Sequence, residues 1–443
     1  MSNFSIGRMN REIMDARTEE TSERGDVGVV PVRTTGRSDD RLPWLALVTM
    51  TLTTFVVVSA EMMPAAVLPD MADGLGVSLA QAGLLVSAWA ATVVVASLPL
   101  ARLTARLERP RVIAAALVVV ALATVVTASA DTYGTAMASR LVAAGATGLL
   151  WSLINAHAAA IVPQRHIARA AAIVLFGGTM GTVVAIPAGN AIAQVVGWRV
   201  PFLVLAVAAL AAAVAVGVVL PRHRVHTAVV VTGIQRTAAP VRLWPVLATA
   251  GLGGLVLSAH FMVFTFVAEV LAPSAVPTPL LLVVFGAVGV GGLVLVGLTG
   301  DRYPTIVPVV VSLAMAAGVW GLVGLGRHAV LDVVLVAMWG VVLGGVGPAV
   351  QGRVMSMAGS RHRATAGSLM PIAMNLGIAL GAAAGSAAVD LWSPQTLPVL
   401  ALVPLLAAAT GFLLLARHAR HGGLGATGAR GGTRTHTPEG TGT

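Results

Sequence analysis

The chain has 443 residues, of which 57% are hydrophobic and only 10% are charged, and its formal net charge is +10. A soluble globular domain carries about a quarter charged residues, so this composition excludes that class and indicates a membrane protein. The absence of cysteine excludes disulfides and cysteine-ligated metals. The arginines stand singly between apolar runs, which argues against nucleic-acid binding and for orientation in a membrane.

Both ends of the chain are polar. Residues 1–41 mix acidic and basic side chains and contain no apolar run of the kind a signal peptide needs, so we expect a disordered cytoplasmic tail or a misassigned start codon. Residues 417–443 are rich in Gly, Thr and Arg and are also expected to be disordered.

Twelve apolar runs lie between these tails, each long enough to cross a hydrocarbon core of about 30 Å as a helix. A polar linker at 221–242 separates them into two groups of six, which predicts halves at 42–220 and 243–416. The predicted spans are 43–69, 79–101, 111–130, 134–161, 168–193, 199–220, 243–271, 279–299, 305–326, 329–350, 365–389 and 395–416.

The arginines give this topology a direction. With both termini inside, only Arg199 and Arg327 fall in outer loops, whereas the loops on the inner side hold Arg102, Arg106, Arg109, Arg111, Arg165, Arg169, Arg222, Arg224, Arg236, Arg242, Arg302, Arg353, Arg361 and Arg363. This is the positive-inside pattern, so we expect both termini in the cytoplasm and the protein in the inner membrane.

The two halves repeat each other weakly. Trp44 opens the first span and Trp244 opens the seventh. Small residues recur at every fourth position in the fifth span (Gly177, Gly181, Ala185, Gly189) and in the eleventh (Gly377, Gly381, Gly385). Internal symmetry of this kind is typical of transporters, in which the substrate site lies between the repeats.

Several local motifs add to this pattern. The first span carries Ser-Ala-Glu-Met-Met-Pro at 59–64, the fourth carries Arg140 with Gly148 and Trp151, and the fifth ends in Ile-Pro-Ala-Gly at 186–189. Further motifs are the basic loop at 101–111, the loop at 297–302 with Asp301 and Arg302, and the run through Trp339, Pro348, Gln351, Arg353 and Asn375.

In their order and spacing these motifs resemble the major facilitator superfamily, in particular its twelve-span drug:proton antiporters near the arabinose-efflux permeases. The resemblance implies an all-α membrane fold of two pseudo-symmetric six-helix halves. It implies that the helix with Gly177, Gly181, Pro187 and Gly189 carries the antiporter motif associated with export. It also implies that Arg106, Asp301 and Arg302 act as cytoplasmic latches, although Ala105 stands where the family has an Asp.

Glu61 is the predicted proton-coupling residue. It lies inside an apolar helix, where a charged side chain costs at least about 2.5 kcal/mol, and such residues are functional by default. A carboxyl there can exchange a proton in competition with substrate. The alternative is an acid that caps the turn before Pro64.

Two further titratable groups have functional and structural interpretations. Arg140 could orient substrate or tune a neighbouring carboxyl, or serve as an interfacial anchor. His260 occupies nearly the position in span seven that Glu61 holds in span one, so it is a second proton-coupling candidate, with a neutral helix-bonding histidine as the alternative. For His157 the structural interpretation is preferred.

The remaining candidates are substrate-cavity residues: Trp89, Trp151, Asn155, Trp339 and Asn375. Each has core packing or helix bonding as its alternative. Glu269, Asp332 and Asp390 lie at the outer interface, where we expect solvated side chains.

These features predict a proton-driven efflux transporter for a small organic molecule, drug-like or metabolite, working by alternating access. We expect a monomer in the bilayer that binds substrate and protons and uses no cofactor, metal or nucleic acid. The alternative with the same fold is an exporter of sugars, nucleosides or amino acids. A membrane enzyme or a sensor is less favoured, because we find neither clustered catalytic residues nor a folded soluble domain.

Overall fold

The computed structural model describes residues 42–163, 166–220, 243–300 and 302–427, and all its regular elements in these ranges are helices. The first half has six membrane-crossing segments. Their elements are α2 (Trp44–Ala66) with the short α3 (Leu68–Leu75), α4 (Leu79–Leu103), α5 (Arg109–Ala128), α6 (Tyr133–Ala160), α7 (Ile167–Met180) with η2 (Gly181–Ala185) and α8 (Ile186–Val196), and α9 (Arg199–Val219).

The second half repeats the arrangement. Its elements are α10 (Leu243–Phe264), α11 (Val267–Leu271), α12 (Thr278–Thr299), α13 (Val307–Gly321) with η3 (Leu322–Gly324), α14 (Ala329–Leu391), η4 (Pro394–Thr396), α15 (Leu397–Leu400) and α16 (Leu402–Thr427). The 63-residue α14 contains two spans, Ala329–Met357 and Leu369–Leu391. Twelve segments long and apolar enough to cross a membrane are thus found in the described ranges, which confirms the predicted count.

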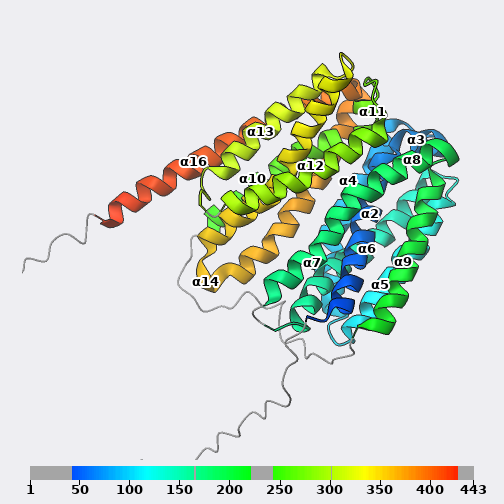
Figure 1. Ribbon diagram of the computed structural model, residues 1–443, viewed down its shortest axis with the longest axis horizontal. Coiled ribbons are helices and arrows are strands. Elements are labelled where there is room, and N and C mark those ends of the chain that lie inside the picture. The colour runs from blue at the N-terminus through cyan, green and yellow to red at the C-terminus, as the bar shows by residue number, and fades with distance from the viewer. Residues whose placement is uncertain (1–41, 164–165, 221–242, 301, 428–443) are drawn as a thin grey trace, which may run out of the picture. The chain divides into compact units, whose positions relative to one another are not determined.

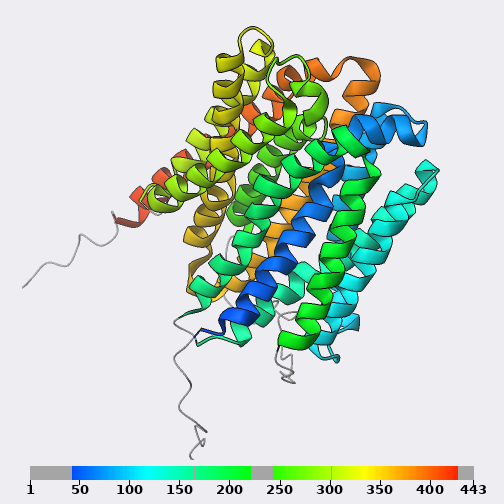
Figure 2. The same ribbon diagram turned by 45° about the vertical axis from the view of Figure 1, so that its right-hand side comes forward.

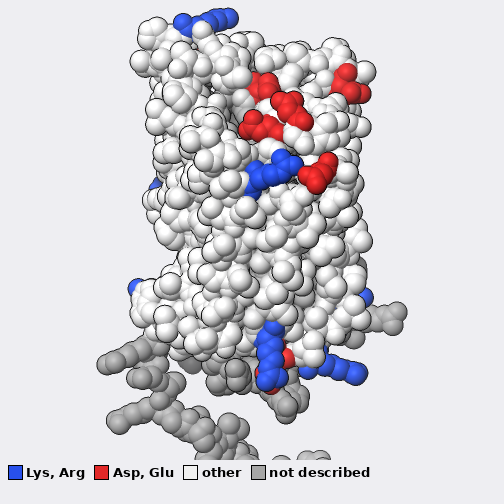
Figure 3. Space-filling view, turned by 90° about the vertical axis from the view of Figure 1, so that its right-hand side faces the viewer, with Lys and Arg blue, Asp and Glu red and all other residues white. Residues whose placement is uncertain are grey.

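Charge divides the bundle into two ends. One end of the bundle, which we call the acidic end, holds Asp70 and Asp73 of α3, Asp131 after α5, Glu269 of α11 and Asp390 near the end of α14. The opposite ends of the helices hold Arg102, Arg106, Arg109, Arg111, Arg169, Arg302, Arg353 and Arg417, and we call this the arginine-rich end. On the face shown in Figure 3 the acidic side chains gather at one end, and the charged groups at the other are mainly basic.

The two halves join at the acidic end. One hydrophobic core runs through the second half and takes in only the acidic-end parts of the first, including Leu68, Trp198 and Phe202. The rest of the first half has a separate core. Across the junction, Ser87 Oγ of α4 donates to the Ala379 carbonyl of α14 at 2.8 Å, and α11 contacts α2 and α3. Figure 1 shows α3, α8 and α11 together at this end, and Figure 2 the same bundle turned.

Both glycine stripes are close-packing faces. A Cβ at Gly177 would overlap the Thr51 carbonyl oxygen, and one at Gly181 would lie 3.1 Å from the Phe55 carbonyl oxygen, both on α2. In the second half, Cβ atoms at Gly377 and Gly381 would overlap carbonyl oxygens one turn apart on α10, those of Gly254 and Ser258. Small residues thus let the backbones touch, as association in lipid requires.

Pro187 disturbs its helix, as its position in the fifth span predicts. Proline has no N–H to bond the carbonyl four residues earlier, and helices respond with kinks or local π turns. The π-helical segment Gly181–Ala185 stands just before Pro187, and the Ile186 N–H bonds to the Gly181 carbonyl. The fifth span is therefore irregular at its centre.

Two expectations need correction. Asp332 is fully buried rather than solvated, because its carboxylate accepts hydrogen bonds from Ser274 Oγ at 2.5 Å and from the Gly326 N–H at 3.0 Å. Residues 417–427, expected to be disordered, continue α16 as helix, since extending an existing helix needs no new nucleus. The predicted tail at 1–41, the linker at 221–242 and residues 428–443 lie outside the described residues.

Candidate functional site

Glu61 and Arg140 meet through the backbone of α2. Pro64 lacks the N–H that would bond the Ala60 carbonyl, which leaves that acceptor free within the helix. Arg140 Nη1 of α6 donates to this oxygen at 2.8 Å, and its Nη2 donates to the Glu61 carbonyl at 3.3 Å. The guanidinium therefore takes the place of the missing N–H and is fixed to the turn that carries Glu61.

A tryptophan completes this group. The Arg140 guanidinium carbon lies 4.0 Å from the ring centroid of Trp89 on α4, a cation–π contact. All three side chains are buried, with Glu61 6% and Arg140 3% exposed. Arg140 Nε and Trp89 Nε1 have no hydrogen-bond partner among the described residues.

The Glu61 carboxylate is not used by this anchoring. The ion pairs formed by the described residues, Arg111–Glu108 and Arg199–Asp131, do not include it. Arg140 binds the backbone oxygens instead, so its positive charge lies near the carboxylate while the carboxylate oxygens stay available. A buried carboxyl whose oxygens form no hydrogen bond or ion pair with the described residues can gain or lose a proton without breaking an interaction that holds the fold.

The second half places an aromatic cluster at the matching level. His260 of α10 is 1% exposed and stacks on Phe264 of the same helix with ring centroids 5.1 Å apart. Its ring is also parallel to Phe285 of α12 at 6.2 Å and lies 5.3 Å from Trp339 of α14. Phe285 and Trp339 are themselves 4.6 Å apart. We call these four residues the aromatic cluster.

The two groups occupy corresponding helices. The first, second and fourth spans supply Glu61, Trp89 and Arg140, and the seventh, eighth and tenth spans supply His260, Phe285 and Trp339. Two polar atoms of the cluster, His260 Nδ1 and Trp339 Nε1, are buried without a hydrogen-bond partner in the described structure.

The other predicted cavity residues do not join these groups through hydrogen bonds. Asn155 is exposed and donates weakly to the Trp151 carbonyl at 3.5 Å, one turn earlier in α6. Asn375 donates to the Pro371 carbonyl of its own helix at 3.1 Å, and its Oδ1 is buried without a partner. Trp151 is partly buried against the core of the first half. His157 is buried.

The predicted latch residues lie at the arginine-rich end. Arg106 and Arg302 are exposed, and the Arg302 guanidinium lies 5.6 Å from the Tyr303 ring centroid. Asp301 lies outside the described residues. In the described part of the chain, no three histidine or acidic side chains gather in a way that could hold a metal ion.

Two elements of the site were not expected from the sequence. Pro64 was noted as a motif residue, but its freed carbonyl as the anchor for Arg140 was not predicted. A proline within a helix leaves a carbonyl acceptor one turn before it, and Arg140 in the fourth span is a donor that needs such a partner. Together these two residues were the signal for the contact. Phe264 and Phe285 were also missed. The signal for Phe264 was its place one helical turn after His260. The signal for Phe285 was its span, the eighth, which corresponds to the second span that carries Trp89.

Twelve spans in two similar halves, with buried polar and aromatic groups at matching levels, define a polytopic membrane transporter. The chain belongs to the Major Facilitator Superfamily, whose family model matches residues 50–382. Its relatives and structural neighbours are transporters rather than enzymes, and the chain is a transporter, not an enzyme.

Two curated relatives come from Mycobacterium tuberculosis strains, and each is named a chloramphenicol efflux pump. Each is 30% identical over 342 residues, covering 75% of this chain and 82% of the relative. Among solved structures, a bacterial homologue of the human lysosomal transporter Spinster, in an inward-facing and unoccupied conformation, has a TM-score of 0.70 at 17% identity and covers 86% of this chain and 98% of its own. The nucleoside transporter NupG has a TM-score of 0.65 at 13% identity, covering 84% and 98%. These structural likenesses concern the fold.

Proposed function

We propose that the chain is a proton-coupled efflux pump for a small drug-like molecule, with Glu61 as the group that carries the proton. The observation that carries the proposal is the buried Glu61 carboxylate, which makes no hydrogen bond to the described residues while Arg140 is fixed to the backbone beside it. Intramembrane acids in such positions mark proton pathways in transporters.

The coupling follows from competition for one charge. When Glu61 is ionised, its carboxylate oxygens can accept hydrogen bonds from hydroxyl or amide N–H groups of a substrate, and the unpartnered Arg140 Nε and Trp89 Nε1 donors can bind oxygens of the same substrate. When Glu61 is protonated, the proton occupies this acceptor. Proton and substrate thus compete for one carboxylate, so that substrate binding favours release of the proton.

The direction of transport and the orientation in the membrane are inferred from the difference between the acidic end and the arginine-rich end of the bundle. The positive-inside rule puts the arginine-rich end in the cytoplasm, with both termini on that side of the plasma membrane. The halves share a core only at the acidic end, which corresponds to an inward-facing arrangement that receives solute from the cytoplasm. Rocking of the two halves against each other, for example where α4 contacts α14, would then open the acidic end, with Arg106 and the Asp301–Arg302 loop as latches.

The substrate class rests on the relatives and on the aromatic cluster. Two relatives at 30% identity are named chloramphenicol efflux pumps, so a neutral aromatic drug is the first probe to use. Trp339 with His260 supplies aromatic faces in the second half, and Trp151, Asn155 and Asn375 are proposed to line the route. His260 is the second candidate for proton coupling.

The test is proton flux in inverted membrane vesicles that hold an imposed pH gradient. Chloramphenicol and panels of sugars and nucleosides are added to wild type, Glu61→Gln and the matched acidic control Glu269→Gln. We expect one class of solute to dissipate the gradient in wild type and Glu269→Gln but not in Glu61→Gln. Equal dissipation in all three variants would remove Glu61 from the coupling, and no flux with any solute would contradict proton antiport of these classes.

A further inference from the structure

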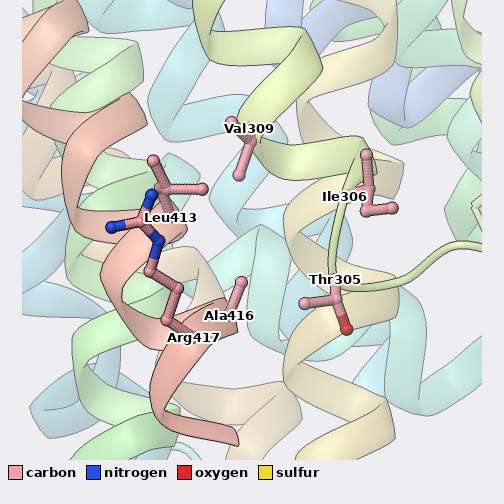
Figure 4. A pocket seen from close by; sticks show the side chains of 6 residues that line it. All are labelled: Thr305, Ile306, Val309, Leu413, Ala416 and Arg417. Atoms are coloured by element: carbon pink, nitrogen blue, oxygen red, sulfur yellow. The ribbon is translucent and has the colours of Figure 1, made fainter. Parts of the chain in front are cut away.

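A groove lies at the arginine-rich end, between the start of α13 and the last turns of the α16 span. Its volume is about 270 Å³, and it is lined by Thr305, Ile306, Val309, Leu413, Ala416 and Arg417. Figure 4 shows the side chains of the two elements facing each other across it. None of these residues belongs to the proposed transport site, whose residues lie on α2, α4, α6, α10, α12 and α14.

The groove has one strong cationic group. In Figure 4 the Arg417 side chain runs back along α16, so that its guanidinium lies beside Leu413. This is the expected direction, because helical side chains lean toward the N-terminus of their helix. Arg417 is exposed and forms no ion pair with the described residues. Its five N–H donors therefore remain open to an anion at the level where the span ends.

Thr305 supplies a polar partner on the opposite wall. Its Oγ1 accepts a hydrogen bond of 3.2 Å from Arg353 Nη1, which comes from α14. Because the threonine oxygen is the acceptor in that bond, its own O–H remains available as a donor. Arg353 adds a second positive charge directly behind this hydroxyl, while the lining itself contains no acidic residue.

The remaining walls are apolar and face outward. Ile306 is 47% and Leu413 41% exposed, and Val309 lies between them in the groove. On a membrane-spanning bundle such exposed aliphatic side chains lie against acyl chains. The groove thus has apolar walls and a positive charge, that of Arg417, at headgroup level. This combination matches a phospholipid with net negative charge.

We propose that this groove binds an anionic phospholipid, with its phosphate on Arg417 and Thr305 and an acyl chain along Ile306, Val309 and Leu413. The site is independent of the transported substrate and of the direction of transport. Its role is to fix the ends of α13 and α16 to one another in the leaflet at the arginine-rich end.

Native mass spectrometry of the purified full chain, titrated with phosphatidylglycerol or phosphatidylcholine, tests the proposal. The variants are Arg417→Gln, Val309→Trp to fill the groove, and Arg327→Gln as an exposed arginine at the acidic end. We expect phosphatidylglycerol to bind wild type and Arg327→Gln equally, and Arg417→Gln about fivefold more weakly, given about 1 kcal/mol per arginine at a lipid headgroup.

The apolar wall and the lipid source are tested in the same experiment. Val309→Trp should weaken phosphatidylglycerol binding although every charge is kept, and soluble glycerol phosphate should not displace the bound lipid. Equal binding by wild type and both groove variants would overturn the proposal. Binding of phosphatidylcholine as tight as that of phosphatidylglycerol, or displacement by glycerol phosphate, would also overturn it.

Discussion

The two halves of the molecule share a packing scheme but differ in the chemistry at their centres. Each half packs a stripe of small residues against its first helix. Gly177 and Gly181 contact α2, and Gly377 and Gly381 contact α10. At the matching central positions the first half has Glu61, Trp89 and Arg140, whereas the second has the aromatic cluster around His260. The repeated fold therefore fixes where the side chains lie, and our proposal assigns the proton chemistry to the first half.

The largest expected effect tests the shared packing. Gly177→Val and Gly377→Val each place a side chain on a backbone carbonyl of the partner helix, which cannot move aside. Overpacking typically costs about 1–3 kcal/mol, and we expect about 3 kcal/mol or more here, with loss of folded protein. Thermal unfolding in detergent is the measurement. Gly217→Val and Gly251→Val are the controls, because no atom lies within 4 Å of their added Cβ. Tolerance of either stripe variant would show that only one half uses its stripe.

The next effect tests the arginine anchor. Arg140→Gln leaves the Ala60 carbonyl buried and unpaired, at a cost of about 1–3 kcal/mol. Pro64→Ala returns an N–H to that carbonyl, so the cost of Arg140→Gln should fall by about 1 kcal/mol in the Pro64→Ala background. The coupling free energy from the four unfolding midpoints is the measurement. Additive effects would show that Arg140 does not substitute for the missing N–H.

A smaller effect concerns the buried acid in the second half. Asp332→Asn weakens the bonds from Ser274 and Gly326, and we expect a loss of about 1–2 kcal/mol of stability with transport retained. Asp390→Asn, a change at the same end of the bundle, should have little effect. A loss of proton flux in folded Asp332→Asn would mean that the second half also carries coupling chemistry.

The smallest effect tests the aromatic cluster. His260→Phe keeps the ring stacking, so stability should change by less than about 1 kcal/mol. If proton chemistry is confined to the first half, substrate-dependent proton flux persists in this variant. Lost flux in a stably folded His260→Phe would transfer the proton site, or part of it, to the second half.

The sequence predicted the twelve spans, the two halves and the repeated small-residue stripes because each rests on a local signal: apolar length, arginine placement or glycine spacing. It placed Glu61, Arg140 and Trp89 separately but did not predict their contact through Ala60, which depends on how α6 lies against α2. Asp332 was misjudged for the same reason. Its position near the start of the tenth span predicted a solvated side chain. In the structure, Ser274 and Gly326, from the loops before α12 and α14, donate hydrogen bonds to its carboxylate. Contacts between distant segments are not encoded in any one motif.

The most direct test of the central claim is proton release when substrate binds to the purified protein. Chloramphenicol is added to wild type, Glu61→Gln and His260→Phe in weakly buffered detergent solution at constant salt, and the pH change is recorded alongside binding. The account predicts that wild type and His260→Phe release protons as drug binds, and that Glu61→Gln binds drug without releasing them. Equal release by Glu61→Gln and wild type would contradict the assignment of the coupling proton to Glu61.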